Sequence, residues 1–278
     1  MNDTAIRRVL QCNLHTHTNL CDGKHSAAEM AAAAADAGMR TLGFSGHSTV
    51  WFDPPCSMSR ENLARYRSEI TDLKAQYRDR MRILLGIEQD FFSDEAAQGF
   101  DFVLGSVHYL RFGEDYYPVD QSREDLLATV RDFCGGDIWR YLRFYYGHMA
   151  TLYERTACDV VGHFDLVMKF NEDGRLFDPL DARHLTPALE ALDALLDREV
   201  VFEINTGAIS RGYRSEPYPL PILLRHIAAR HGRVCINSDA HAKEGLQSYF
   251  PEAVEHARAA GLGSLVVMGE RGWEEVPL

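Results

Sequence analysis

The sequence lacks the long apolar runs of a membrane protein. No stretch reaches the roughly 18 consecutive apolar residues that a membrane span needs, and residues 1–20 contain no apolar run of signal-peptide length. These absences predict a cytoplasmic protein without a membrane partner.

Cysteine motifs are missing as well. The six cysteines are scattered, and no two of them stand in a C-x-x-C arrangement. This spacing excludes the usual zinc-finger patterns and provides no disulfide framework, so we expect reduced thiols.

Positive charge is scarce, because 29 Lys and Arg residues stand against 41 Asp and Glu residues and give a formal net charge of -12. Such a field repels nucleic-acid phosphates, and we expect no nucleic-acid partner. Repeats, low-complexity tracts and interdomain linkers are also absent, and the length of 278 residues suits a closed α/β barrel, which typically needs about 250. The sequence therefore predicts a single domain over residues 1–278.

The chain does contain a regular alternation of strand-type and helix-type segments. Strands are expected at Gln11–His15, Thr41–Ser45, Ile83–Ile87, Phe102–Ser106, Val160–His163, Val200–Ile204, Val234–Asn237 and, as an eighth, Ser264–Met268. Helices are expected at Ala27–Ala37, Glu61–Tyr77, Ile138–Arg155, Ala182–Leu196, Leu220–Arg230 and Ala253–Ala260. This order predicts an α/β fold with a mostly parallel sheet. The longest segments without a strand, residues 51–60 and 113–136, are candidate active-site loops.

Residues of metal-ligand type recur where the predicted strands end. His15 and His17 share one face at the first strand, as do Asp239 and His241 after the seventh, because side chains alternate along a strand. The full set is His15, His17, Asp22, His47, Glu88, His108, His163, Asp239 and His241. Any one of them could be an ordinary turn or capping residue. Their shared position at strand ends favours a metal site, because those ends meet on one face of a parallel barrel.

Most of the other histidines do not follow this rule. They fall within or beside predicted helices and are interpreted as structural or solvated: His148, His184, His226, His231 and His256. His25 lies three residues after Asp22 and could reach the site.

These motifs resemble the polymerase and histidinol phosphatase (PHP) superfamily. The similarity rests on His15-Thr16-His17, Asp22-Gly23, His47, Glu88, His108, His163 and Asp239-Ala240-His241, which span nearly the whole chain. The resemblance implies a distorted (β/α)7 TIM-like barrel with three divalent metal ions, commonly zinc, manganese or iron. It further implies three ligand groups: His15, His17, Glu88 and Asp239 for one ion, Glu88, His108 and His163 for a second, and Asp22, His47 and His241 for a third.

The chain is most similar to the stand-alone histidinol-phosphate phosphatases of that superfamily. The segments that carry this are Gly86-Ile87-Glu88-Gln89-Asp90, residues 103–108, residues 159–166 and Glu203-Ile204-Asn205-Thr206-Gly207, together with the Tyr-rich insertion at Arg140–Tyr153. Many of these phosphatases have a histidine where this chain has Asp22-Gly23. The resemblance implies a hydrolase that converts L-histidinol phosphate and water to L-histidinol and phosphate in histidine biosynthesis.

Physical chemistry agrees with that activity. Imidazole and carboxylate ligands suit zinc, manganese and iron alike, and Glu88 can bridge two cations through its two oxygens. Clustered ions lower the pKa of a shared water towards about 7, and the resulting hydroxide can attack a phosphoryl group. We expect Glu88, Asp239 and His241 to be the catalytic residues.

Phosphate recognition also calls for cations outside the metal ligands. Lys169 and Arg211 lie in loops that follow ligand-bearing or adjacent strands, and they are the candidate phosphate-binding residues, with Arg214 as a weaker competitor. Asp90 or Tyr213 could contact the ammonium or imidazole of the substrate.

Other functions remain open from the residues. The protein could act on a different small phosphomonoester, or be a nuclease or phosphodiesterase, although its acidic charge argues against a nucleic-acid substrate. A non-catalytic metal-binding module would be expected to lack ligands, and none is missing. An amidohydrolase barrel would need a lysine or equivalent bridge on the fourth strand, where this chain has His108. The protein is expected to be a monomer or a homodimer.

Overall fold

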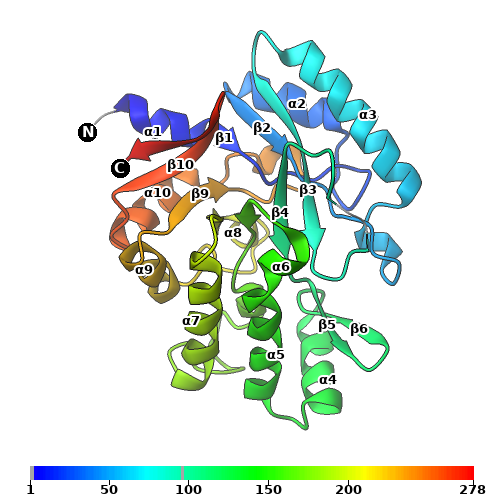
Figure 1. Cartoon of the computed structure of the whole chain (residues 1–278), viewed down its shortest axis with the longest axis vertical. Helices are drawn as coiled ribbons and strands as arrows, with labels where there is room; N and C mark the ends of the chain where they lie inside the picture. The colour runs from blue at the N-terminus through cyan, green and yellow to red at the C-terminus, as the bar shows by residue number, and fades with distance from the viewer. Residues whose placement is uncertain (1–2, 95–96) are drawn as a thin grey trace.

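Seven parallel strands form a nearly closed barrel in the computed structural model, which describes residues 3–94 and 97–278 (Figure 1). In sheet order they are β1 (Cys12–Asn13), β2 (Thr41–Phe44), β3 (Arg82–Asp90), β4 (Phe102–Ser106), β7 (Val160–Val161), β8 (Val201–Asn205) and β9 (Arg233–Asn237). Backbone bonds close the ring beyond β1 and β9, where His17 N donates to Ala240 O at 2.9 Å and Ala240 N donates to His15 O at 3.1 Å. The predicted (β/α)7 TIM-like architecture is confirmed.

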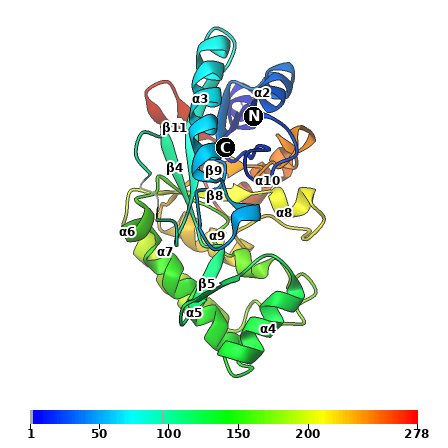
Figure 2. The same cartoon turned by 90° about the vertical axis from the view of Figure 1, so that its right-hand side faces the viewer.

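Helices surround these strands and fill the connections between them. They are α1 (Asp3–Leu10), α2 (Ala27–Asp36), α3 (Arg60–Tyr77), α4 (Arg123–Phe133), α5 (Ile138–Ala150), α6 (Leu152–Thr156), α7 (Ala182–Leu196), α8 (Gly207–Ser210), α9 (Pro221–Ala229) and α10 (Phe250–Ala259). Two antiparallel hairpins complete the fold: β5 (Tyr109–Phe112) with β6 (Asp115–Pro118), and β10 (Ser264–Gly269) with β11 (Gly272–Pro277). Figures 1 and 2 show α4, α5 and the β5–β6 hairpin extending beyond the barrel strands.

Several predicted elements differ from the structure. The eighth strand, Ser264–Met268, exists as β10, but it pairs only with β11 and does not belong to the barrel sheet. The helix predicted over Ile138–Arg155 is divided between α5 and α6 at Thr151, whose backbone N–H bonds to His148 O instead of continuing the α-helical pattern. Residues 113–136, predicted as a loop, contain β6 and α4. Ser122 caps the start of α4, because its side chain accepts a bond from Asp125 N.

The first strand is shorter than predicted for a local reason. Leu14 N donates to the side-chain oxygen of Asn237 at 2.8 Å, so it is not available for the strand ladder. The chain therefore leaves the regular sheet just before His15 and His17.

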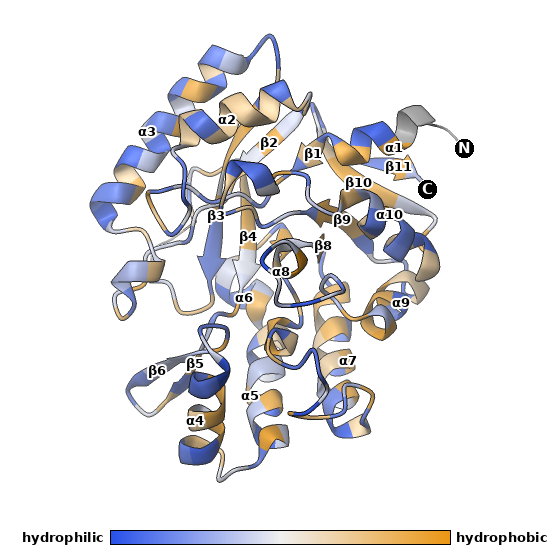
Figure 3. Cartoon of the chain, turned by 180° about the vertical axis from the view of Figure 1, so that it is seen from behind, coloured by the Kyte–Doolittle hydropathy of each residue, from blue (hydrophilic) through white to orange (hydrophobic). Residues whose placement is uncertain are grey.

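Helix α3 shows how the outer layer attaches to the barrel. Its buried residues Tyr66, Ile70, Leu73 and Tyr77 recur at helical spacing, and most of the other residues of the helix are hydrophilic (Figure 3). The Tyr66 hydroxyl donates to Gly86 O at 2.9 Å and ties the helix to β3.

One aromatic ring fills the barrel interior between three strands. A Cβ added at Gly86 would lie 2.2 Å from Phe102 Cζ, and one added at Gly43 would lie 2.8 Å from the same atom. The two glycines leave the space that the buried Phe102 ring occupies.

The six cysteines are free thiols, as expected. Among the described residues, no helix combines the length and the apolar character needed to cross a membrane.

Candidate metal centre

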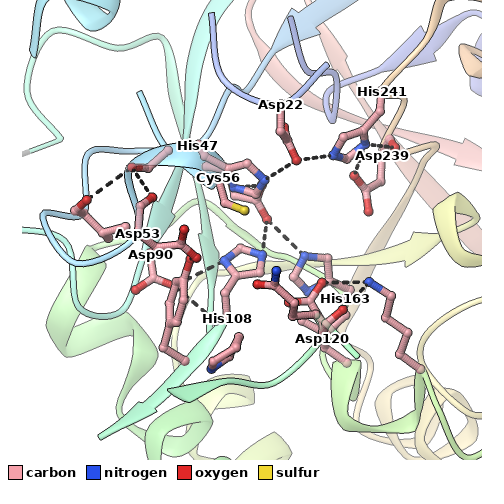
Figure 4. A pocket seen from close by; sticks show the side chains of 18 of the residues that line it. Asp22, His47, Asp53, Cys56, Asp90, His108, Asp120, His163, Asp239 and His241 are labelled. Carbon is pink, nitrogen blue, oxygen red and sulfur yellow. Dashed lines mark hydrogen bonds and ion pairs between the residues drawn. The ribbon is translucent and has the colours of Figure 1, made fainter. Parts of the chain in front are cut away.

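The carboxyl ends of the barrel strands bring the nine predicted ligands together. Glu88 lies near the end of β3, and the others follow strands: His15, His17 and Asp22 after β1, His47 after β2, His108 after β4, His163 after β7, and Asp239 and His241 after β9. Figure 4 shows the labelled members of this set pointing toward one another. The side chains form four overlapping groups of three or four residues whose ligand atoms lie within 4.8 Å of one another.

Glu88 is at the centre of the cluster and is fully buried. Its Oε1 lies 3.0 Å from His163 Nε2 and 3.2 Å from His108 Nε2. Its Oε2 lies 3.0 Å from His47 Nδ1 and 3.3 Å from His15 Nε2. The two oxygens of one carboxylate thus face two different sets of imidazoles.

Two further carboxylates extend the cluster on either side. Asp239 Oδ1 lies 3.2 Å from His17 Nε2. Asp22 Oδ2 lies 3.0 Å from His241 Nε2 and 3.5 Å from His47 Nε2. Each of these carboxylates therefore lies close enough to imidazole nitrogens for the carboxylate and the imidazoles to bind the same cation.

The buried polar atoms at the centre fit metal ions. His15 Nε2, His17 Nε2 and Glu88 Oε2 are buried and have no hydrogen-bond partner. Buried polar atoms without partners are costly, and nitrogen and oxygen donors of this kind bind zinc, manganese or iron. The cluster could therefore hold metal ions.

Electrostatics keep the carboxylates ionised. Burial alone would raise the pKa of Glu88, but the charges of His15, His47 and His108 hold that pKa well below its usual value. The pKa of Asp239 is likewise held low, against the effect of burial, mainly by the charge of Arg211. Metal ions would find both groups deprotonated at neutral pH.

Comparison with known proteins places the chain in a family. The family model described as the PHP domain matches residues 13–207. The chain belongs to the PHP domain family. A probable histidinol-phosphatase from Deinococcus radiodurans is 31% identical over 271 residues, which cover 90% of this chain and 94% of that protein. A histidinol-phosphatase from Bacillus subtilis is 24% identical and matches 82% of this chain and 92% of its own length.

A solved structure shares the fold of this PHP protein. The histidinol phosphate phosphatase from Lactococcus lactis, crystallised with zinc, L-histidinol and phosphate, aligns with a TM-score of 0.70 at 21% identity. The alignment covers 95% of this chain and 99% of that structure.

Sequence reasoning did not single out the role of Glu203 in the PHP site. This buried carboxylate of β8 lies 3.1 Å from His15 Nδ1 and accepts bonds from His163 N at 2.8 Å, Asn205 Nδ2 at 2.7 Å and Asn237 Nδ2 at 2.8 Å. The available signal was a glutamate inside an otherwise apolar strand, because such a group must be paired when buried.

The contacts of Asp90 differ from the substrate contact that the sequence suggested for it. Its Oδ2 accepts a bond from His108 N at 3.1 Å and lies 3.2 Å from His108 Nδ1, and its Oδ1 accepts a bond from Phe92 N at 2.7 Å. Asp90 is therefore committed to orienting His108, as carboxylates behind metal-binding histidines commonly are. It is less available to a substrate cation than the sequence suggested.

Both candidate phosphate-binding residues line the same cavity of about 400 Å³ as the cluster. Lys169 Nζ donates to the backbone oxygen of Asp120 at 2.6 Å and to its Oδ2 at 2.9 Å, and it lies 4.7 Å from the centroid of the Tyr213 ring. Arg211 bonds to Asp239 Oδ2 at 2.9 Å and lies 2.7 Å from His241 Nδ1. The two cations approach the cluster from different loops.

Arg214 occupies a different environment. Its buried guanidinium donates to Met168 O at 2.9 Å and does not line this cavity. It is better placed to hold the loops together than to bind phosphate.

The remaining histidines lie outside the ligand groups found among the described residues. His184 bonds to Tyr146 and to Pro179 O, as expected of a structural residue. His25 Nδ1 accepts a bond from Lys243 N at 3.3 Å, and His25 does not line the cavity.

Proposed function

We propose that this PHP protein is a histidinol-phosphate phosphatase that hydrolyses L-histidinol phosphate to L-histidinol and phosphate. The observation that carries the proposal is the convergence of six histidines and three carboxylates in one cluster, most of which lines a cavity that Lys169 and Arg211 also line. Relatives named histidinol-phosphatase or probable histidinol-phosphatase match most of the chain. The chain is a phosphoric monoester hydrolase of the histidinol-phosphatase type.

We propose three divalent ions, held by the ligand groups that the family resemblance implies. The oxygen contacts support the place of Glu88 in two of these groups, because Oε1 faces His108 and His163 while Oε2 faces His15. Oε2 also lies 3.0 Å from His47, which the proposal assigns to the third ion. Bound ions would neutralise charge on the phosphoryl group and lower the pKa of a water towards about 7.

The remaining chemistry comes from side chains of this chain. Glu88 is proposed to bridge ions, and Asp239 and His241 are proposed to act beside it, where both contact Arg211. Lys169, held in place by Asp120, and Arg211 would bind the phosphate oxygens. These contacts fix the positions of Lys169 and Arg211 before the substrate binds.

We also propose that residues 1–278 form one catalytic domain. A single cluster of buried apolar residues reaches from Val9 to Val276 and supports this view.

The test of the proposed function is steady-state phosphate release by the metal-loaded protein. L-histidinol phosphate is compared with a panel of other phosphomonoesters and with a nucleotide diester. We expect the highest kcat/KM for L-histidinol phosphate. Strong turnover of another monoester with none of L-histidinol phosphate would overturn the substrate, and preferred cleavage of the diester would overturn the reaction class.

A further inference from the structure

Three carboxylates other than the proposed metal ligands line the cavity, and two of them are engaged. Asp90 orients His108, and Asp120 pairs with Lys169 at 2.9 Å. Asp53 is the third, and among the described residues no Lys, Arg or His forms an ion pair with it. Asp53 is therefore a half-buried carboxylate on the cavity wall whose charge no cationic side chain of the described residues pairs.

The Asp53 carboxylate is held firmly in this position. The Tyr109 hydroxyl donates to its Oδ2 at 2.7 Å, and the backbone oxygen of Asp53 accepts a bond from Ser57 Oγ at 2.9 Å. The preceding residue, Phe52, stacks on Tyr116 with ring centroids 3.8 Å apart. The other carboxylate oxygen, Oδ1, accepts no hydrogen bond from the described residues and remains available to a ligand.

Asp53 lies on the opposite side of the cavity from the residues that surround Arg211. Figure 4 shows it across the cavity from Asp239 and His241, which are the residues that Arg211 contacts. A small ester whose phosphate lies against Arg211 and the metal ligands would extend its other end toward Asp53.

We infer that Asp53 is a specificity-determining residue that binds a cationic group at the end of the substrate remote from the phosphate. The inference rests on the proposed phosphomonoesterase function and adds the residue that recognises the ammonium or imidazolium of the substrate. A charge-assisted hydrogen bond to Oδ1 pairs a carboxylate that no cation of the described residues pairs, and it selects against neutral esters.

The test is Asp53→Asn, which removes the charge but keeps an oxygen that can accept the Tyr109 bond. Kinetics are measured on L-histidinol phosphate and on a matched minimal pair, phosphoethanolamine and ethyl phosphate. We expect kcat/KM to fall about 10- to 100-fold for the two cationic esters, mainly through KM, and to stay unchanged for ethyl phosphate. Asp79→Asn, at a strongly exposed carboxylate outside this cavity, should leave all three unchanged.

Equal losses on cationic and neutral esters would overturn the inference, as would no loss on any of them. If the wild-type protein cleaves other esters but not L-histidinol phosphate, the minimal pair still decides the role of Asp53. If it cleaves no phosphomonoester, the proposed function fails, and calorimetry with L-histidinol then tests Asp53 separately. Binding that is lost in Asp53→Asn supports the inference, and binding that is equal in both proteins or absent from both overturns it.

Discussion

The Glu88 carboxylate contacts histidines that come from four different strand ends of the barrel. Because its two oxygens face different imidazoles, it can bridge two ions. We expect Glu88→Gln to lose metal from two positions and to lower kcat/KM on the order of 10³-fold, because the bridging anion is gone. Metal content by elemental analysis and phosphate release check this.

Glu61→Gln is the matched control, because Glu61 is exposed on α3 and lies outside the cavity. It should keep full metal content and activity. An unchanged metal stoichiometry in Glu88→Gln would show that Glu88 is not the bridge.

The position of Glu203 requires a side chain that accepts hydrogen bonds and donates none, and an ionised carboxylate meets this requirement. His163 N, Asn205 Nδ2 and Asn237 Nδ2 all donate to it, and as an acceptor it also places the proton of His15 on Nδ1, which leaves Nε2 for a metal ion. Glutamine at this position would present an NH₂ group to neighbours that are donors. We expect Glu203→Gln to weaken metal affinity by about 10- to 100-fold.

Competition with a chromophoric chelator measures this affinity without reference to activity. Glu203→Ala should be no more than modestly worse than Glu203→Gln. Wild-type affinity in Glu203→Gln would contradict a positioning role that depends on an anionic acceptor.

At the scale of elements, the α5–α7 contact contains a titratable group remote from the metal centre. His184 on α7 is fully buried and lies 2.8 Å from the Tyr146 hydroxyl of α5. Burial lowers the pKa of His184 below its usual 6.5. The unfolded chain therefore binds a proton near that pH that the folded protein does not, and stability falls as the pH drops below about 6.5.

Thermal unfolding midpoints of wild type and His184→Gln, measured between pH 5 and pH 8, test this linkage. We expect the variant to lose less stability on acidification than the wild type, whatever its midpoint at pH 8. The same pH dependence of the unfolding midpoint in both proteins would contradict this linkage.

Strands β3 and β4 pack closely because Gly86 of β3 has no side chain where the Phe102 ring of β4 lies. A methyl group at Gly86 would overlap the buried ring of Phe102, so Gly86→Ala should lower the free energy of unfolding by about 1–3 kcal/mol. Gly147→Ala is the control, since nothing lies within 4 Å of its added methyl on α5 and it should stabilise by about 0.5–1 kcal/mol. Urea denaturation of both variants measures the difference, and equal stabilities would contradict the packing.

Local patterns were sufficient for most of the barrel. Helix α7 has the bounds predicted for it, and in the structure Asp181 caps its first turn. The β5–β6 hairpin and α4 were not predicted, because they are joined by tertiary ring contacts: Phe112 of β5 stacks on Phe133 of α4 and packs edge-on against Phe144 of α5. Pairing partners cannot be found from local pattern either, which is why β10 was counted with the barrel strands.

At the scale of the whole molecule, the barrel connects residues that are far apart in the chain. His15 and His17 meet Asp239 because β1 and β9 are neighbours in the closed ring. Their position at strand ends was visible in the sequence, as was the consequence that they share one face. The tasks of Asp53, Asp90 and Glu203 were not visible, because they depend on which donors and cations surround each carboxylate after folding.

The most direct test of the central claim is phosphate release from L-histidinol phosphate by metal-free protein to which zinc, manganese or iron(II) is added stepwise. We predict no turnover without metal and, from the three ligand groups proposed above, a maximum at three ions per chain. Turnover by the metal-free protein, or none at any metal content, would contradict a metal-dependent histidinol-phosphate phosphatase.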